Sequence, residues 1–204
     1  ADIDFTLKNS ILDSKLLLKS NEFGIADGYI KFDKDKNIDG KITNKEIKLV
    51  NLNSFTDLVH IKDGKLALNI YTKGNLKKIN DHPESLILET VADIKNLKTD
   101  YFSKGKTYSF DIISYQNTLT YSNGILNTDM SLISNVPGDI DSKITLDVIK
   151  GDISGNIITK EIDLSKLKAF IPPKIINIKK GKLKINSDFK TNLNEVISNY
   201  LNVN

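Results

Sequence analysis

The stretch that decides the fold is IKDGKLALNIYTKGNL, residues Ile61–Leu76. Its apolar residues Leu66, Leu68 and Ile70 alternate with more polar neighbours, which is typical of a strand with one buried face. Further alternating runs include Tyr108, Phe110 and Ile112, and Ile144, Leu146 and Ile149. Turn signals separate the runs: Asp27-Gly28, Asp63-Gly64, Asn123-Gly124, Pro137-Gly138 and Lys180-Gly181. The pattern predicts a mainly β protein with a largely antiparallel sheet.

The chain contains much of this segment twice. GKITNKEIKLVNLNSF (Gly40–Phe55) aligns with GNIITKEIDLSKLKAF (Gly155–Phe170), sharing eight of sixteen positions at an offset of 115 residues. IKDGKLALN (Ile61–Asn69) aligns with IKKGKLKIN (Ile178–Asn186), sharing six of nine at an offset of 117. We expect a single β-rich domain or fragment over residues 1–204, with one repeat near 5–79, connecting strands near 80–114 and a second repeat near 115–196.

Helical segments are expected at three places. Each repeat should carry a short helical turn after its first long strand, around Leu52 to Leu58 and again at Leu164 to Phe170. Near the C-terminus, Thr191 or Asn192 is a candidate cap for an amphipathic helix over residues 191–203. Its apolar residues have helical spacing: Leu193, Val196, Ile197, Tyr200 and Leu201.

Composition argues against several classes of protein. The net charge is only +3, and all 29 basic residues are Lys, so the guanidinium fork that reads guanine is missing and nucleic acid is not an expected partner. The chain has no Cys, and its two His residues, His60 and His82, lack companions at metal-ligand spacing. No nucleophile elbow, phosphate loop or dinucleotide motif occurs. We therefore expect a protein that is not an enzyme and needs no cofactor.

One motif points to calcium. DKNIDGKITNKE (Asp35–Glu46) spells an EF-hand loop, with Asp35, Asn37, Asp39 and Glu46 at ligand positions. The second repeat places Lys150, Asp152, Ser154 and Glu161 opposite them, so the repeats share a strand rather than a ligand set. The preceding residues alternate as a strand, not as a helix. We predict strand, hairpin turn and strand here, with Glu46 pointing at solvent, and keep calcium as the weaker alternative.

The repeated unit resembles the AsmA-like superfamily of bacterial envelope proteins, the AsmA, TamB and YhdP type. The resemblance rests on KEIKLVNLNSF followed by IKDGKLALNIYTKGNL, and on KEIDLSKLKAF followed by IKKGKLKINSDFKTNL. A GxLxLxxxxxG strand of that family matches Gly64 to Gly74, whereas Thr191 replaces the closing Gly in the second repeat. The resemblance implies an elongated, curled sheet in the periplasm, tethered to the inner membrane. The chain begins at Ala1, so we expect a processed form or a fragment.

The function that the resemblance implies is binding or conduction of phospholipid acyl chains along an apolar groove between the inner and outer membranes, with outer-membrane assembly proteins as further partners. Pattern alone favours a closed sandwich core instead. The second hypothesis is a non-catalytic structural or adhesive β-module at the cell surface, stabilised by calcium in one version. The expected groove-lining residues are Ile42, Leu66, Leu68, Ile70, Phe110, Ile112, Ile157, Leu183, Ile185 and Phe189.

Overall fold

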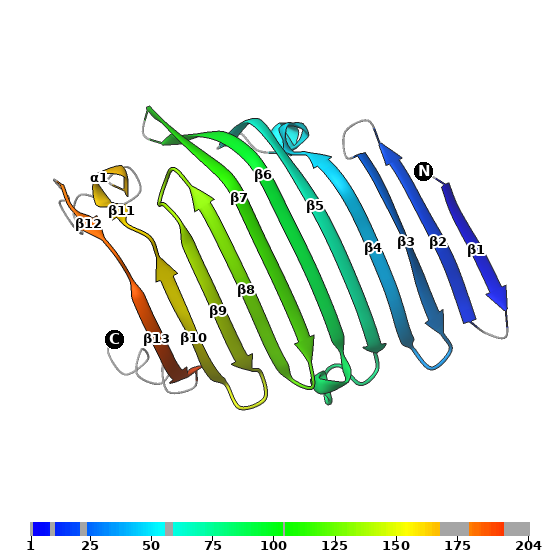
Figure 1. Ribbon diagram of the computed structural model, residues 1–204. Helices are drawn as coiled ribbons and strands as arrows, with labels where there is room; N and C mark the ends of the chain where they lie inside the picture. Colours follow the sequence, from blue (N-terminus) through cyan, green and yellow to red (C-terminus); the bar gives the residue numbers. More distant parts are fainter. Residues whose placement is uncertain are drawn as a thin grey trace.

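The computed structural model describes residues 2–8, 11–20, 24–55, 59–103, 105–167 and 180–193, and one antiparallel sheet of eleven strands dominates it (Figure 1). Ten strands lie side by side in chain order, and β13 follows β10 at the far edge. They are β1 (Asp2–Lys8), β2 (Ile11–Ser20), β3 (Gly24–Asp33), β4 (Asn37–Lys48), β5 (Val59–Asn75), β6 (Ile87–Ser103), β7 (Lys106–Ser122), β8 (Ile125–Ser134), β9 (Ile140–Asp147), β10 (Asp152–Thr159) and β13 (Asn186–Asn192).

Small elements lie at the ends of these strands. The 3₁₀-helix η1 (Leu49–Phe55) joins β4 to β5, and η2 (Pro83–Ser85) precedes β6. After β10, the two-residue strands β11 (Ile162–Asp163) and β12 (Lys182–Leu183) pair with each other beside the short helix α1 (Leu164–Leu167). Within the described residues, the search for a helix long and apolar enough to cross a bilayer found none.

The strand registers divide the sheet into two chemically different faces. Ile70 lies opposite Ile42 on one neighbouring strand and opposite Thr90 on the other, and the same row continues through Leu119. Because directly opposed residues share a face, these rows define one side of the sheet, which we call the apolar face. In β2 to β10 and β13, none of its described positions is charged. The opposite side, the outer face, carries Lys, Asp and Glu.

Two irregularities keep the long central strands on this pattern. The pairing of β7 with β8 shifts between Ile112 and Ser114, so Ile113 is an extra residue and is 59% exposed. In β6, Asn96 has a left-handed φ of 51°. Leu97 and Ile112 therefore stay opposite each other, and Ile112 stays opposite Ser134 on the apolar face.

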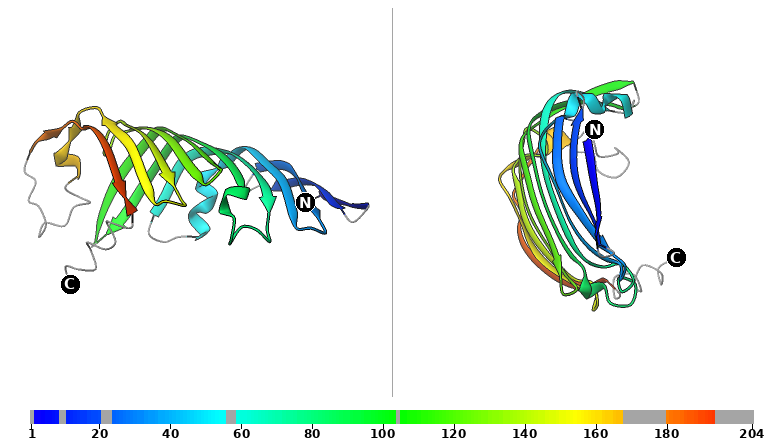
Figure 2. Two further views of the ribbon diagram at one scale, coloured as in Figure 1. Left: turned by 90° about the horizontal axis from the view of Figure 1, so that it is seen from below. Right: turned by 90° about the vertical axis from the view of Figure 1, so that its right-hand side faces the viewer.

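The sheet curls into an open trough (Figure 2). A Cβ atom on Gly64 would lie 3.1 Å from a side-chain methyl of Leu97 in β6 and 3.2 Å from one of Leu49 in η1. Leu97 belongs to the apolar face, so η1 lies over that face. Figure 2 shows η1 inside the curve, which makes the apolar face the concave one. The predicted curled, antiparallel sheet is confirmed.

A second layer is missing from the part of the chain that the structure describes. The accessible surface is 14023 Å², whereas a compact 22.8 kDa monomer exposes about 9,600 Å². Among the described residues, the only buried apolar side chains are those of Leu49, Tyr121 and Ile162, and none of the three is completely buried. The closed sandwich that alternation alone favours is therefore not formed here, because the described strands all belong to one open layer or to the small β11–β12 pair.

Helical boundaries differ from the expectations. The first helical turn begins at Leu49 rather than Leu52, and the described part of the second is Leu164–Leu167. Thr191 and Asn192 pair in register with β10 and end strand β13. Leu193, the next residue, is helical, so Asn192 lies at the predicted cap position. Residues 56–58, 168–170 and 194–203 of the predicted helices lie outside the described residues. Ile149, assigned to an alternating run, follows β9 in an exposed turn.

Candidate functional site

The candidate binding surface is the concave apolar face. Nine of the ten predicted groove-lining residues share this face by strand register, and they come from β4, β5, β7, β10, β13 and the residue that precedes β13. They are Ile42, Leu66, Leu68, Ile70, Phe110, Ile112, Ile157, Ile185 and Phe189. All but Ile157, Ile185 and Phe189 lie in the first seven strands. Leu183 is the exception, because it pairs with Ile162 in the separate β11–β12 ladder and is 39% exposed.

Much of the face comes from residues that the sequence analysis did not assign to the groove. Central strands β6, β7 and β8 contribute Leu88, Ile94, Tyr115, Leu119, Tyr121, Leu126, Met130 and Leu132. Tyr101 and Tyr108 also lie opposite each other on it. Period-two alternation would have found most of these positions. The signal was weaker because polar residues such as Thr90 and Asn117 interrupt the apolar series.

Several polar groups of the apolar face are occupied by hydrogen bonds within the protein. The Ser14 hydroxyl donates to the Ile30 carbonyl oxygen at 2.9 Å, and the Asn117 side-chain amide donates to the Thr128 hydroxyl at 3.0 Å. Ser134 similarly donates to the Gly138 carbonyl oxygen at 2.9 Å. Groups paired in this way do not need water or ligand partners. The face therefore presents mainly hydrocarbon to whatever lies in the trough.

In the strands that the structure describes, charge lies on the outer face and at the strand ends. Lys62 Nζ lies 2.7 Å from Asp100, which also accepts a hydrogen bond from Ser109 at 2.6 Å. These two contacts lower the pKa of Asp100 below its usual value. Lys143 and Asp129 pair across β8 and β9 at 2.8 Å, which raises the pKa of Lys143. The sheet is thus apolar on its concave side and zwitterionic on its convex side.

The 3₁₀-helix η1 lies at one rim of the trough, where β4 ends and β5 begins (Figure 2). Strand β5 runs past the end of β4, since their register stops at Lys48 and Lys65. Asn53 of η1 covers the exposed stretch: its side-chain NH₂ donates to the Ile61 carbonyl oxygen at 2.8 Å, and Ile61 N–H donates to its Oδ1 at 2.7 Å. The side chain thereby replaces the missing strand, and η1 forms a wall over the apolar face.

The EF-hand-like segment is a hairpin, as predicted. Strand β3 ends at Asp33 and β4 begins at Asn37, and Lys36 takes a left-handed φ of 66° in the turn between them. Glu46 is exposed and forms an ion pair with Lys65 at 3.1 Å. The Glu46 prediction is confirmed.

The calcium alternative fails on geometry. Asn37 and Glu46 belong to the same extended strand, and nine residues of strand span about 30 Å. Asn37 instead donates to Asp33 at 2.8 Å, and Asp39 accepts from the Tyr29 hydroxyl at 3.0 Å. Asp35, Asn37, Asp39 and Glu46 cannot surround one ion, because an EF-hand needs a loop that wraps its ligands. In the described residues, no group of three His, Asp or Glu side chains has the geometry of a metal site.

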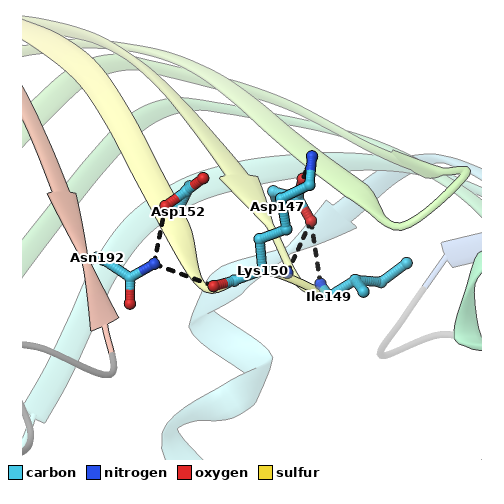
Figure 3. A network of polar contacts seen from close by, with 5 residues as sticks. All are labelled: Asp147, Ile149, Lys150, Asp152 and Asn192. Atoms are coloured by element: carbon cyan, nitrogen blue, oxygen red, sulfur yellow. Dashed lines mark hydrogen bonds and ion pairs between the residues drawn. The ribbon is translucent and has the colours of Figure 1, made fainter.

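A second turn repeats the hydrogen bonds of this hairpin (Figure 3). The Asn192 side-chain amide donates to the Lys150 carbonyl oxygen at 3.0 Å and to Asp152 at 2.8 Å. Asn75 donates in the same way to the Asp35 carbonyl oxygen at 3.0 Å and to Asn37 at 2.7 Å. The offsets are 115 residues for the acceptors and 117 for the donors, as in the aligned sequences.

The backbone at the two turns matches as well. Leu193 N–H donates to the Gly151 carbonyl oxygen at 2.8 Å, and Leu76 N–H donates to the Lys36 carbonyl oxygen at 2.9 Å. Gly151 and Lys36 both have a left-handed φ, of 77° and 66°. A duplicated unit would produce such matching contacts. In this comparison, β13 of the second repeat corresponds to β5 of the first.

The histidines are exposed. His82 Nδ1 lies 3.0 Å from Glu84 in the η2 turn. A backbone hydrogen bond lowers the pKa of Glu84, and the contact with His82 lowers it further. His60 lies on β5, also exposed.

Comparison of the chain with protein-family models, with curated proteins and with solved structures found no match.

Proposed function

We propose that this chain binds acyl chains, with phospholipid as the natural ligand, along its concave apolar face. The observation that carries the proposal is an eleven-stranded sheet whose concave face has no charged position in its described residues and no covering layer among them. Soluble monomers rarely leave so large an apolar surface uncovered unless it binds something. A non-catalytic role fits a surface of this kind.

The energetics support a lipid. Burying a methylene stabilises a complex by about 0.8 kcal/mol, so ten half-buried methylenes contribute roughly 4 kcal/mol. An acyl chain also needs no hydrogen-bond partner, and several of the polar side chains on this face already donate to acceptors within the protein. A long, open trough suits a long, flexible and featureless ligand better than a compact polar one.

The resemblance to AsmA-like envelope proteins gives the proposal its cellular setting. A periplasmic chain, tethered to the inner membrane, would hold phospholipid out of water on its way to the outer membrane and would meet outer-membrane assembly proteins there. The matched hydrogen bonds at Asn75 and Asn192 support a duplicated unit of the kind that this family uses. The setting rests on the resemblance, whereas the binding surface rests on the sheet itself.

Lipid carried by the purified protein tests the proposal. Protein made in bacteria should release phospholipid on extraction, show lipid-bound masses in native mass spectrometry, and bind a fluorescent fatty acid. Protein that is free of lipid and also fails to bind the fluorescent fatty acid would overturn it. A structural or adhesive module is then the remaining candidate, since β13 ends the sheet with no further strand beside it in the described part of the chain.

A further inference from the structure

Strand β13 forms one edge of the large sheet (Figure 1). Among the described residues, no strand pairs with the edge of β13 that faces away from β10. Its hydrogen bonds to β10 involve the odd-numbered positions, since Thr159 N–H donates to the Ile185 carbonyl oxygen at 2.9 Å. Peptide groups alternate along a strand, so Asn186, Asp188 and Lys190 direct theirs away from β10. Such an edge is a template for another strand.

The other half of the sheet shows what this edge can hold. Asn192 makes the same two hydrogen bonds in its turn as Asn75 makes in the first, which places β13 where β5 stands. Strand β5 carries β6 on its far side, in antiparallel pairing. The matching side of β13 is therefore suited to an antiparallel strand.

The sequence of β13 is complementary to itself. It reads NSDFKTN, and an antiparallel copy centred on Phe189 places Asp188 opposite Lys190 of the second copy, and the reverse. Ser187 then faces Thr191, and Asn186 faces Asn192. Within the chain, Asp188 and Lys190 are exposed and lie opposite the uncharged Asn156 and Ser154. Both ion pairs would form on the outer face, while the two Phe189 rings would meet on the apolar face.

Strand direction decides between two ways of joining copies. All neighbouring strands are antiparallel and the sheet has eleven, so β1 and β13 run in the same direction. Head-to-tail stacking would pair β13 with β1 in parallel. A two-fold axis perpendicular to the sheet gives antiparallel pairing and leaves both troughs open to the same side. We propose that two copies of this chain pair through β13, in register about Phe189, and form one continuous sheet.

Charge reversal tests this register. The edge is short, and it buries far less than the ~1,200 Å² of a standard interface, so the dimer should depend on concentration in sedimentation velocity. Lys190→Asp should weaken dimerisation by about tenfold or more, because it replaces two attractive pairs by two repulsive ones. Asp188→Lys should do the same. Mixing the two variants restores both opposite-charge pairs and should restore a heterodimer. Lys41→Asp, an exposed charge reversal away from the edge, is the matched control.

Disulfide trapping gives an independent readout, since the chain has no Cys. Phe189→Cys should form a disulfide-linked dimer on mild oxidation, because residue 189 faces itself across a non-hydrogen-bonded pair. Asp188→Cys should not, because it faces residue 190. Trapping by Phe189→Cys together with heterodimer rescue would support the proposal. A monomer at every concentration with no trapped dimer would overturn it, as would a dimer that Lys190→Asp leaves unchanged.

Discussion

Asn75 and Asn192 make the same pair of hydrogen bonds at two turns of the sheet, each to a turn carbonyl oxygen and to the side chain two residues further on. Each therefore ties a hairpin turn to the strand that follows the short helical element of its half. Replacing either by Ala should lower the free energy of unfolding by about 1 kcal/mol, as expected for lost hydrogen bonds in an exposed setting.

Urea denaturation checks this, with Asn69→Ala, an exposed residue on the outer face of β5, as the control. The two effects should add in the double variant, because the turns share no partners. If Asn75→Ala, Asn192→Ala and the control are equally stable, the matched hydrogen bonds do not contribute to the free energy of unfolding.

Gly28 is required by close backbone packing rather than by its dihedral angles. A Cβ at Gly28 would collide with the Lys41 carbonyl oxygen on the neighbouring strand, whereas one at Gly40 would lie 3.4 Å from the nearest oxygen, that of Tyr29. Gly28→Ala should therefore destabilise the protein by about 2 to 3 kcal/mol, and Gly40→Ala by much less. Thermal unfolding of the two variants compares them directly, and an equal loss would contradict the close approach.

Acid should weaken the turn that Figure 3 shows. Backbone and side-chain contacts with Lys150 lower the pKa of Asp147, so the folded state binds that proton less tightly than the unfolded chain does. The stability contributed is present above the unfolded pKa of about 3.9 and is lost as pH falls through the lowered folded value.

Asp147→Asn should therefore be less stable than the parent protein at pH 7, and the gap should narrow as the pH falls below the unfolded pKa of about 3.9. Urea midpoints measured across this range provide the test. Asp27→Asn, an exposed position on the outer face of β3, serves as the control. A gap that stays constant with pH would contradict the role of the Asp147 carboxylate.

Calcium should leave the protein unchanged, despite the EF-hand spelling of Asp35–Glu46. The strand β4 separates Asn37 from Glu46, so the six to eight oxygens that calcium takes cannot come from these residues. Titration calorimetry should show no binding heat, and the melting temperature should be the same in calcium and in chelator. A calcium-dependent rise that Glu46→Gln abolishes would overturn this expectation.

Alternation along the strands was sufficient to predict the antiparallel sheet, the hairpin at Asp33 and a shared face for nine of the ten expected groove-lining residues. It could not decide whether that face is covered, because an open trough and a closed sandwich require the same period of two. It also could not place Leu183, whose short ladder with Ile162 depends on contacts distant in sequence. The bulge at Ile113 could not be predicted for a similar reason. It is defined by the pairing of Ile112 with Leu97 in β6 and with Ser134 in β8, and these partners are distant in sequence.

The concave face can be tested with two neighbouring positions of β5. Leu68 lies on the apolar face opposite Ala92, and Asn69 lies on the outer face opposite Val91. Leu68→Lys should weaken binding of a fluorescent fatty acid by about tenfold or more, because an ammonium group in the trough must stay hydrated while an acyl chain displaces water. Asn69→Lys adds the same charge one residue away on the other face and should bind normally.

Leu68→Phe, which keeps the position apolar, separates loss of binding from loss of folding. Its affinity should stay within a few-fold of the parent protein, and circular dichroism should confirm an intact sheet in all three variants. If Leu68→Lys folds and binds as well as Asn69→Lys, the acyl chain does not lie on the concave face, whatever lipid the protein carries.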